Sequence, residues 1–490
     1  MRSERLRIAD FSGRPLTLAD GPEAWETLKD QGEDLLLLGL GPGNGPFLGA
    51  CASQKLYWLE APAIRAATQS NQHTPSTWTE VSEEQVLSLF PRARVLFFRQ
   101  NHFLAPSFWS SLLGRCFALH WQKAQTRAVY IPGNSDMLLH SELVWACRQL
   151  GFGPVVEHLA ADNEDSLALA FDGRPPAFCL SVNGRGLDVQ GRLFALFQAL
   201  HVPCAIWIVD NPWHVLSRCK LPWWKEADLF VTDPSFIQGL LAEGARHVSY
   251  LPLAYAPHMW RPLIDWESSP QPLLFVGRSA FPDKERFFAA VRLPQDLLKQ
   301  AKILLAKGST PDIHWWYQHC AVDLWPGTGA RLAGAGAEQC SQKNRVRWLE
   351  AARDLGCIVV GDKGWQNLLP QVQLRPPVDY YGSLPELYSQ ALAVLNVTSL
   401  QLPQSLNQRH FDVWAAGGLL ITDATQGLQL FPDELTREIS LHHPAQLPAL
   451  VARIRQEKQH FQQLKIAWRE YLATEHSYHS RLKSLLNSLP

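Results

Sequence analysis

The chain has 490 residues, with 45 Lys and Arg against 46 Asp and Glu, and a formal net charge of -1. This near-neutral balance, without a block of like charges, argues against a dedicated nucleic-acid binder and against a polybasic membrane anchor. With a hydrophobic share of 46% the chain is not compositionally disordered, and at ~150 residues per domain its length predicts about three domains.

The start of the chain, Met1–Asp10, carries charges but no apolar signal core. No apolar run approaches the ~18 residues of a membrane span, so we expect no stable membrane insertion. The nine Cys residues are scattered, odd in number and form no C-x-x-C pair. We therefore expect reduced core thiols in a cytoplasmic protein.

The first block, residues 1–125, contains three short apolar runs that we expect to be strands, at 34–38, 55–60 and 94–98. Apolar runs alternate with helical patterns here and almost throughout the chain, which is typical of an α/β fold with parallel sheets. A Gly-rich loop from Gly39 to Gly45 follows the first run. We interpret this block as a Rossmann-like accessory domain.

The second block, residues 126–262, repeats the alternation. Helical patterns at 137–150 and 187–200 separate expected strands, and Gly151 marks the end of the first helix. The expected strands begin at residues 128, 155, 177, 204, 229 and 248. We predict a second Rossmann-like domain here.

The third block, residues 273–441, follows a Pro- and Trp-rich segment at 257–272 that is typical of an interdomain linker. Its expected strands lie at 273–277, 357–361, 393–397 and 419–423, while 309–342 is predicted to be irregular. Residues 442–490 have helical spacing, with apolar side chains at 447, 450, 451 and 454. These patterns predict four segments: 1–125, 126–262, 273–441 and 442–490.

The whole pattern predicts an α/β protein in which two Rossmann-like doubly wound domains face a cleft. An extra N-terminal α/β domain precedes them, and a C-terminal helical tail follows them. In doubly wound sheets ligands bind at the carboxyl ends of the strands, where the strand order reverses. We therefore expect the functional site in the cleft between the two domains.

Residues 395–423 carry the most informative pattern. A strand ends near Val397, a polar loop follows, and a helix opens near Asn407 and ends at Gly417. Helix N-termini attract phosphates, and Arg409 would add charge-assisted hydrogen bonds to a diphosphate. The Asp412 carboxylate would accept hydrogen bonds from ribose hydroxyls. An ordinary helix, with Asn407 as its cap and Asp412 as a surface acid, is the alternative.

This stretch resembles the nucleotide-sugar-binding motif of the spore-maturation CgeB-like proteins, which have a glycosyltransferase B-type fold. Their pattern, Leu-Asn-x-Arg-x-Phe-Glu with a later Gly and a closing Thr-Asp, is matched over most of residues 406–423. Asp412 stands where the family usually has Glu, and Gln404 stands where related retaining enzymes have a second Glu. The resemblance implies that Asn407, Arg409 and Asp412 bind a nucleotide-sugar donor.

The resemblance extends over most of the second block and to the end of the chain, covering residues 126–490. The second block would then be the acceptor-side domain and the third the donor-binding domain. The stretches that carry this wider resemblance are 178–188, 207–214, 229–235 and 476–481.

Polar residues at two expected strand ends of the second block are candidates for catalysis. Asp210 and His214 follow the strand at 204–209, and a strand tip facing the cleft is where a general base would lie. His214 is the competing base, or a phosphate contact. Asn183, Gly184 and Asn211 are the candidate acceptor contacts. The alternative for both strand ends is an ordinary turn.

Gly277 and Arg278 end the first expected strand of the third block. Gly277 permits close backbone approach and Arg278 would meet a pyrophosphate. In the sequence, no His, Cys, Asp and Glu residues have a spacing that is typical of a metal site. We therefore expect Arg side chains and helix N-terminal amides to bind the donor diphosphate, with no metal and no cofactor besides the donor substrate.

The Gly-rich loop from Gly39 to Gly45 supports a different hypothesis. Glu60 closes the next expected strand, and a strand, a Gly-rich turn and an acid suit a nucleoside ligand such as S-adenosylmethionine or NAD. A methyltransferase is therefore one alternative function. A non-catalytic binding protein that keeps the fold is another, because Gln404 and Asp412 depart from the family pattern.

The leading expectation is a bacterial glycosyltransferase that moves a sugar from a nucleotide-sugar to a protein, such as flagellin, or to a surface glycan. In an inverting reaction Asp210 would deprotonate the acceptor, while Arg409 would stabilise the departing diphosphate. The sequence alone leaves the donor sugar, the acceptor and the stereochemical outcome open.

Overall fold

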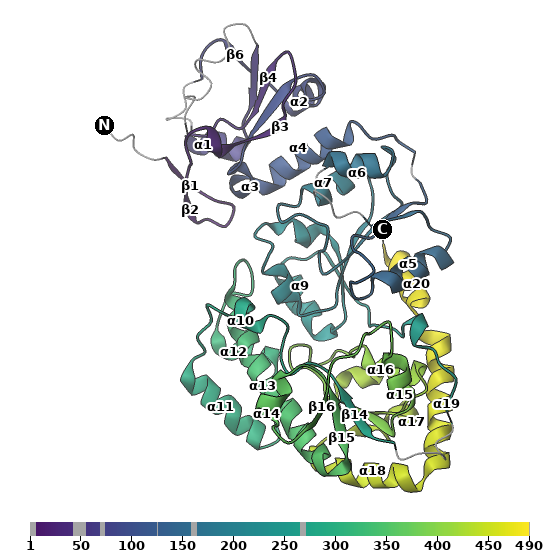
Figure 1. The fold of residues 1–490 in the computed structure, drawn as a ribbon. Helices are drawn as coiled ribbons and strands as arrows, with labels where there is room; N and C mark the ends of the chain where they lie inside the picture. The colour runs from purple at the N-terminus through teal and green to yellow at the C-terminus, as the bar shows by residue number, and fades with distance from the viewer. Residues whose placement is uncertain are drawn as a thin grey trace.

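The computed structural model describes residues 6–42, 55–68, 74–124, 126–157, 164–264 and 271–489. Three α/β units follow one another along the molecule, and the last helices of the chain run back along the third unit to the second (Figure 1). Within the described ranges, none of the helices combines the length and the apolarity that crossing a bilayer requires.

The N-terminal unit is a five-stranded sheet with a small antiparallel hairpin beside it. The sheet order is β3-β7-β4-β5-β6, with β3 antiparallel to β7 and the remaining pairs parallel. Its strands are β3 (Trp25–Lys29), β4 (Leu35–Leu38), β5 (Leu56–Leu59), β6 (Trp78–Glu80) and β7 (Arg94–Phe98). The hairpin and helices are β1 (Arg7–Ala9), β2 (Pro15–Thr17), α1 (Pro62–Thr68), α2 (Glu83–Leu89), α3 (Asn101–Leu104) and α4 (Pro106–Ala118).

The middle unit is an all-parallel sheet in the order β13-β12-β11-β10-β8-β9, so the strand order reverses between β8 and β10. The strands are β8 (Val129–Tyr130), β9 (Val155–Val156), β10 (Cys179–Val182), β11 (Cys204–Ile208), β12 (Asp228–Val231) and β13 (His247–Tyr250). The helices are α5 (His140–Gln149), α6 (Glu164–Ala170), α7 (Arg192–Ala199), α8 (Pro212–Leu216) and α9 (Ile237–Ala242).

The third unit is a second all-parallel sheet, β16-β15-β14-β17-β18-β19, which reverses between β14 and β17. The strands are β14 (Leu273–Val276), β15 (Cys357–Val360), β16 (Gln373–Arg375), β17 (Ala393–Asn396), β18 (Leu420–Asp423) and β19 (Ser440–Leu441). The helices are α10 (Lys284–Phe287), α11 (Gln295–Ala306), α12 (Ile313–Cys320), α13 (Gly329–Ala352), α14 (Gly364–Leu368), α15 (Leu384–Ser389), α16 (Arg409–Ala415) and α17 (Asp433–Thr436).

The C-terminal tail forms three helices, α18 (Leu447–Gln456), α19 (Lys458–Glu475) and α20 (Tyr478–Ser488). Helix α19 packs on α16 through Trp414 and Trp468, whose rings stack with centroids 4.6 Å apart. Helix α20 lies against α5 of the middle unit, so the chain crosses between the two units twice (Figure 1).

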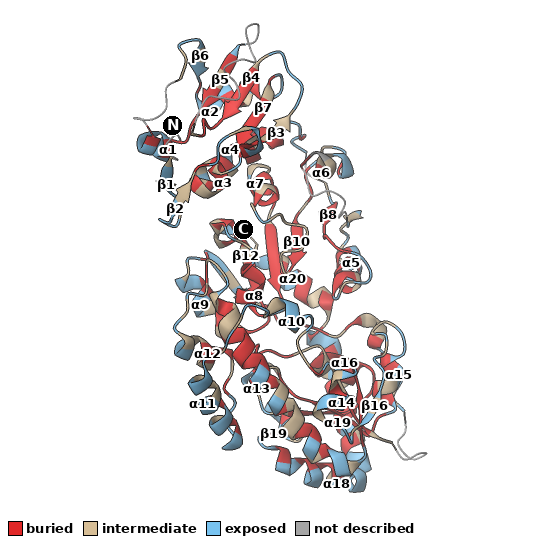
Figure 2. Ribbon diagram, turned by 60° about the vertical axis from the view of Figure 1, so that its left-hand side comes forward, coloured by how far each residue is buried: buried red, intermediate tan, exposed pale blue. Residues whose placement is uncertain are grey.

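The central strands of all three sheets are buried, while the outer faces of the surrounding helices are exposed (Figure 2). Near-continuous apolar runs such as Cys204–Ile208 are what a strand covered on both faces requires. The predicted α/β class with two doubly wound domains is confirmed. The eight cysteines in the described ranges are free thiols, and six of them are buried.

The prediction that 309–342 is irregular was wrong, because this segment contains α12 and the first half of α13. The buried face of α13 consists largely of Ala and Gly, so it shows no apolar periodicity. The small residues permit close packing. A Cβ atom at Gly334 would lie 2.0 Å from the His214 ring, and one at Gly336 would lie 2.3 Å from the Trp316 ring.

Candidate active site

Two adjoining cavities lie at the carboxyl ends of β14 and β17, where the strand order of the third unit reverses. One, about 580 Å³ in volume, is lined by the loops that follow β14 and β15. The other, about 450 Å³, is lined by both doubly wound units and includes Asp210, Gly277, Asn407, Arg409 and Asp412. This is the position in which doubly wound sheets bind ligands.

Arg409 begins α16 and is the cation that lines the second cavity. Its guanidinium donates from Nε to Asn396 Oδ1 (2.7 Å) and from Nη1 to the Val276 carbonyl oxygen (2.6 Å). Both partners are neutral, and within the described part of the chain Arg409 forms no ion pair. Burial lowers the pKa of Arg409. A partly buried cation without a carboxylate partner favours an anionic ligand.

Asn396 and Asn407 hold this arginine in place. Asn407 Nδ2 donates to Asn396 Oδ1 (2.7 Å), and Asn407 Oδ1 accepts from the Arg409 backbone amide (3.1 Å). Asn396 Nδ2 donates in turn to Thr422 Oγ1 (3.0 Å) on the neighbouring strand. The N-cap of α16 is Gln408, so Asn407 lies one residue before the expected cap and accepts the amide hydrogen of the first helical residue from there. Because Asn407 already accepts the Arg409 amide, the arginine side chain is the better anion contact here.

Asp412 is 1% exposed and lies one turn into α16. Its Oδ1 accepts from the Ala256 amide (3.0 Å) and from Gln408 Nε2 (3.0 Å), while Oδ2 accepts from the Tyr380 hydroxyl (2.8 Å). Desolvation raises the pKa of Asp412 to about 7, against the opposing effect of these hydrogen bonds. Three of its four acceptor positions are thus occupied, which leaves one for a ligand.

Asp210 lines the second cavity from the opposite side, at the end of β11. Its Oδ2 accepts from Asn183 Nδ2 (2.8 Å). Desolvation raises the pKa of the Asp210 carboxyl, while the Asn183 hydrogen bond and the charges of Arg185 and Arg218 act in the opposite direction. A carboxylate in an open cavity with a raised pKa is suited to accept a proton.

The structure does not bring His214 to either cavity. It is 5% exposed and packs against the rings of Phe281, Phe287 and Phe288, with centroids 5.2–6.0 Å away. Burial lowers the pKa of His214 to about 4, so the ring is neutral at physiological pH. The apolar surroundings assign it a packing role.

The three candidate acceptor contacts also lie outside the cavity linings. Asn211 is a buried cap of α8, whose Oδ1 accepts from the Trp213 amide (3.0 Å) and the Tyr317 hydroxyl (3.2 Å). Asn183 and Gly184 form the turn after β10, with φ values of 55° and 72°. Asn183 is connected to the second cavity through its hydrogen bond to Asp210.

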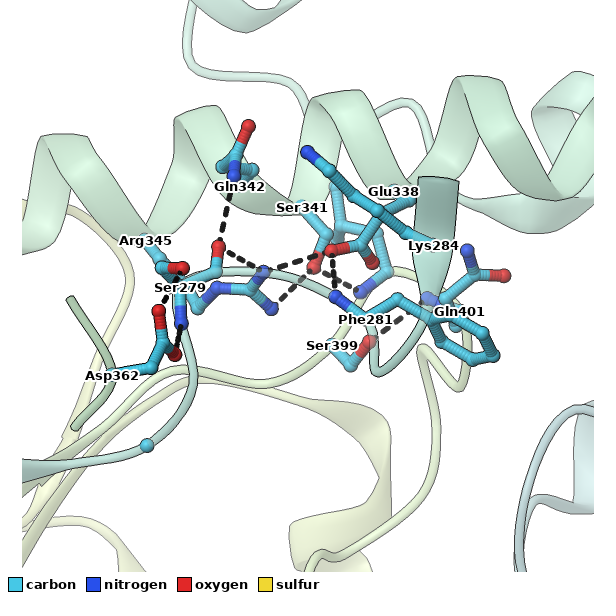
Figure 3. Close-up of polar contacts among 12 residues, drawn as sticks. Ser279, Phe281, Lys284, Glu338, Ser341, Gln342, Arg345, Asp362, Ser399 and Gln401 are labelled. Atoms are coloured by element: carbon cyan, nitrogen blue, oxygen red, sulfur yellow. Dashed lines mark hydrogen bonds and ion pairs between the residues drawn. The ribbon is translucent and has the colours of Figure 1, made fainter. Parts of the chain in front are cut away.

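The loop after β14, residues 277–283, lines the first cavity and carries Arg278, which is exposed. Ser279 is fixed at each polar atom (Figure 3). Its amide and its hydroxyl donate to Asp362 (2.8 and 2.6 Å), and its carbonyl accepts from Gln342 Nε2 (2.9 Å) and Arg345 Nη2 (3.3 Å).

Helix α13 holds this loop at a second point. Glu338 Oε1 accepts from the Phe281 amide (2.8 Å) and pairs with Arg345 Nη2 (3.1 Å) (Figure 3). The same helix holds the loop after β17, because Ser341 Oγ accepts from the Leu400 amide (3.2 Å). One helix thus fixes the loop after β14, which lines the first cavity, and the loop after β17, which lines the second.

The Gly-rich loop of the N-terminal unit has a different geometry. Gly39 and Gly41 are described, whereas Gly43 and Gly45 lie outside the described residues. Glu60 is 4% exposed, and its carboxylate accepts from the amides of Leu40 and Ala61 (both 2.9 Å). Burial raises the pKa of Glu60 to about 7. The Glu60 carboxylate therefore forms hydrogen bonds within the turn instead of being available to a nucleoside.

No group of three or more His, Cys, Asp or Glu side chains within the described ranges is placed to hold a metal ion. The polar side chains around the cavities are instead amides, hydroxyls, two arginines and separate carboxylates.

Residues 343–487 match a family described as glycosyl transferase-like. The match includes Asn407, Arg409 and Asp412, and it ends within α20. It does not include the middle unit, which carries Asp210. No curated protein matches the chain.

Three of the solved structures to which this chain is similar are the following. T4 phage BGT, in complex with its UDP-glucose substrate, is 8% identical, over 73% of this chain and 96% of that one, with a TM-score of 0.38. HepE of Anabaena, in complex with UDP and glucose, is 8% identical over 74% and 100%, with a TM-score of 0.38. Spinosyn rhamnosyltransferase SpnG, complexed with thymidine diphosphate, is 12% identical over 92% and 99%, with a TM-score of 0.29.

The strand orders of the two doubly wound units, and their shared cavity, give the chain a glycosyltransferase B-type architecture. Of the residues proposed from the sequence, Arg409, Asp412 and Asp210 line this cavity. The sequence analysis did not propose Asn396, Tyr380 or the Glu338–Arg345 pair. Asn396 had a detectable signal, because it directly follows the buried run Ala393–Leu395 and therefore lies at a strand end.

Proposed function

We propose that the chain is a glycosyltransferase that moves a sugar from a nucleotide-sugar donor to an acceptor bound by the middle unit. The observation that carries the proposal is Arg409. It is a partly buried guanidinium without an ion pair in the described chain, and it faces a cavity at the strand switch point. A diphosphate would supply the missing negative charge.

The donor would bind to the third unit. Arg409 binds the diphosphate, and Gly277 allows the chain to approach it closely. Arg278, exposed beside the first cavity, adds a second cation. Asp412 accepts a hydrogen bond from a ribose hydroxyl at its remaining acceptor position. Asn407 orients Arg409 indirectly, because it donates a hydrogen bond to Asn396 Oδ1.

Asp210 would act as the general base across the cavity. It takes the proton from an acceptor hydroxyl, whose oxygen then forms a bond to the anomeric carbon. The bond from that carbon to the diphosphate breaks, and the electron pair leaves with the diphosphate, which Arg409 stabilises. His214 has no part in this proposal, because it lies among Phe rings. We propose that these arginines bind the diphosphate without a metal.

A protein, such as flagellin, or a surface glycan is the acceptor in this proposal. The N-terminal unit supports it, because α4 packs on α7 of the middle unit and thus adds surface to the acceptor side. The abundance of Trp gives no support, since Trp109, Trp213 and Trp224 are among the fully buried side chains. A cytoplasmic location, a bacterial source and the CgeB-like subfamily are also parts of the proposal.

The test is calorimetric binding of UDP, GDP, CMP and dTDP sugars, together with hydrolysis of the bound donor. We expect one nucleotide class to bind the wild type and to bind Arg409→Met at least ~30-fold more weakly, because a charge-assisted pair is lost. Asp210→Asn should bind the same donor normally but turn it over at least ~100-fold more slowly. EDTA should leave turnover unchanged.

S-adenosylmethionine and NAD belong in the same panel. Binding of either, without binding of any nucleotide-sugar, would assign function to the N-terminal unit and contradict the proposal. Donor binding without hydrolysis or transfer to any acceptor would identify a non-catalytic binding protein. Full activity of Asp210→Asn would remove Asp210 as the base.

A further inference from the structure

The turn after β10 contains Asn183, whose side chain forms hydrogen bonds to the residues that directly follow β11. Asn183 has φ = 55°, in the left-handed region that Asn tolerates better than most residues. The backbone N–H of Asn183 donates a hydrogen bond to the Trp207 carbonyl oxygen (2.9 Å), which fixes the turn to β11.

The Asn183 side chain bonds to the two residues that follow β11. Its Oδ1 accepts from the Val209 amide (2.9 Å), and its Nδ2 donates to Asp210 Oδ2 (2.8 Å). The two bonds use both ends of the carboxamide, so the group has one possible orientation. In the described part of the chain, Oδ1 of Asp210 has no hydrogen-bond partner, so the carboxylate is held by one oxygen only.

We propose that Asn183 is a positioning residue for Asp210. It orients the carboxylate by holding Oδ2, and it leaves Oδ1 to accept the proton of the acceptor. This inference rests on the proposed function, because it takes Asp210 as the base. It replaces the sequence-based expectation that Asn183 contacts the acceptor itself.

The groups that face Asp210 affect the pKa of its carboxyl. These are Arg185, from the loop after β10, and Arg218, which follows α8, together with the Asn183 amide. All three lower the pKa of the carboxyl, against desolvation, which raises it. Deleting the amide removes one of the three opposing effects. The base then becomes protonated at a higher pH, and activity at low pH falls.

The variant that isolates this effect is Asn183→Gly, because Gly adopts the same positive φ without strain. We expect the acidic limb of the kcat profile to move up by about one pH unit. The loss of kcat should be about 10-fold at the acidic end and should shrink at high pH. The dissociation constant of the donor nucleotide should not change.

A double-mutant cycle completes the test. If Asn183 acts through Asp210, Asn183→Gly should cause no further loss in the Asp210→Asn background. Asn487→Gly, at an exposed Asn in α20, controls for the general effect of a new glycine.

Two results would overturn the inference while leaving the proposed function intact. One is a pH-independent loss of kcat in Asn183→Gly. The other is a rise in acceptor KM alone, which would show that Asn183 contacts the acceptor. Full activity of Asp210→Asn is a separate result, and it would contradict the proposed function itself.

Discussion

At the scale of single residues, Arg409 and Arg192 show two ways in which a folded chain keeps an arginine out of water. Arg192 is 20% exposed and pairs with Glu26 (2.7 Å) and Glu164 (2.9 Å). Arg409 bonds only to neutral oxygens. A guanidinium whose charge is neutralised by carboxylates within the fold stabilises the fold. A guanidinium without such a partner, beside a cavity, is suited to bind an anionic ligand.

This contrast predicts opposite behaviour of two matched variants. Arg192→Met should destabilise the fold by about 3 kcal/mol, because it leaves two partly buried carboxylates without their cation. Arg409→Met should cost only about 1–2 kcal/mol for the hydrogen bonds lost, yet it should weaken donor binding at least ~30-fold. Chemical denaturation and calorimetry on both variants would test this. A larger stability loss for Arg409→Met would indicate that it is a structural arginine.

Which residues the sequence could predict depended on what each residue contacts. Arg409 and Asp412 could be proposed together from the sequence because they lie within one turn of the same helix, so their spacing is visible in the chain. The partners Asn396 and Tyr380 come from distant segments, and only the folded sheet brings them to α16. The packing of His214 could not be predicted from the sequence for the same reason. Three Phe rings from residues 281–288 surround the His214 ring. The sequence around position 214 does not indicate that these distant residues pack there.

At the scale of secondary structure, α13 connects the parts of the site. It bonds to the loop after β14 through Glu338 and to the loop after β17 through Ser341. Its first half packs on α8 of the middle unit, where Gly334 meets His214. The sequence predicted most strands, because buried parallel strands are short apolar runs. It could not predict α13, because a helix face of Ala and Gly has no apolar stripe.

The role of α13 predicts a donor-specific effect of Glu338→Gln. The substitution removes the charge that pairs with Arg345 and weakens the bond to the Phe281 amide, so the loop that lines the first cavity becomes less ordered. We expect donor KM to rise about 5-fold with kcat nearly unchanged. Glu285→Gln, an exposed acid on α10, is the matched control. Equal effects of the two variants, or a loss confined to kcat, would contradict this role.

At the scale of the whole molecule, the two doubly wound units meet where the chain crosses between them twice. The Tyr255 amide donates to the His476 carbonyl (3.1 Å), which joins the two crossing segments. Asp412, in α16, and Gln408, at the N-cap of that helix, form hydrogen bonds to this junction. Asp412 accepts from Ala256, and Gln408 accepts from the Tyr478 hydroxyl (2.9 Å). A carboxyl of the candidate donor site is therefore also part of the joint between the units.

This placement couples stability to pH through Asp412, whose pKa burial raises from 3.8 to about 7. Between pH 4 and 7 the folded chain keeps a proton that the unfolded chain releases, so the contribution of Asp412 to stability falls as pH rises through this window. Above it the contribution is constant. Asn at this position carries no such charge. The melting temperature of Asp412→Asn should therefore rise relative to wild type up to about pH 7 and then level off.

The measurement is the difference in melting temperature between Asp412→Asn and wild type at half-unit steps from pH 4.5 to pH 8.5. Asp433→Asn, at a carboxylate that is 74% exposed, serves as the control for a loss of surface charge. A difference that does not change with pH would show that the Asp412 carboxyl is ionised throughout this range. The junction would then hold a buried carboxylate, and the three donors from Ala256, Gln408 and Tyr380 would have to compensate its charge fully.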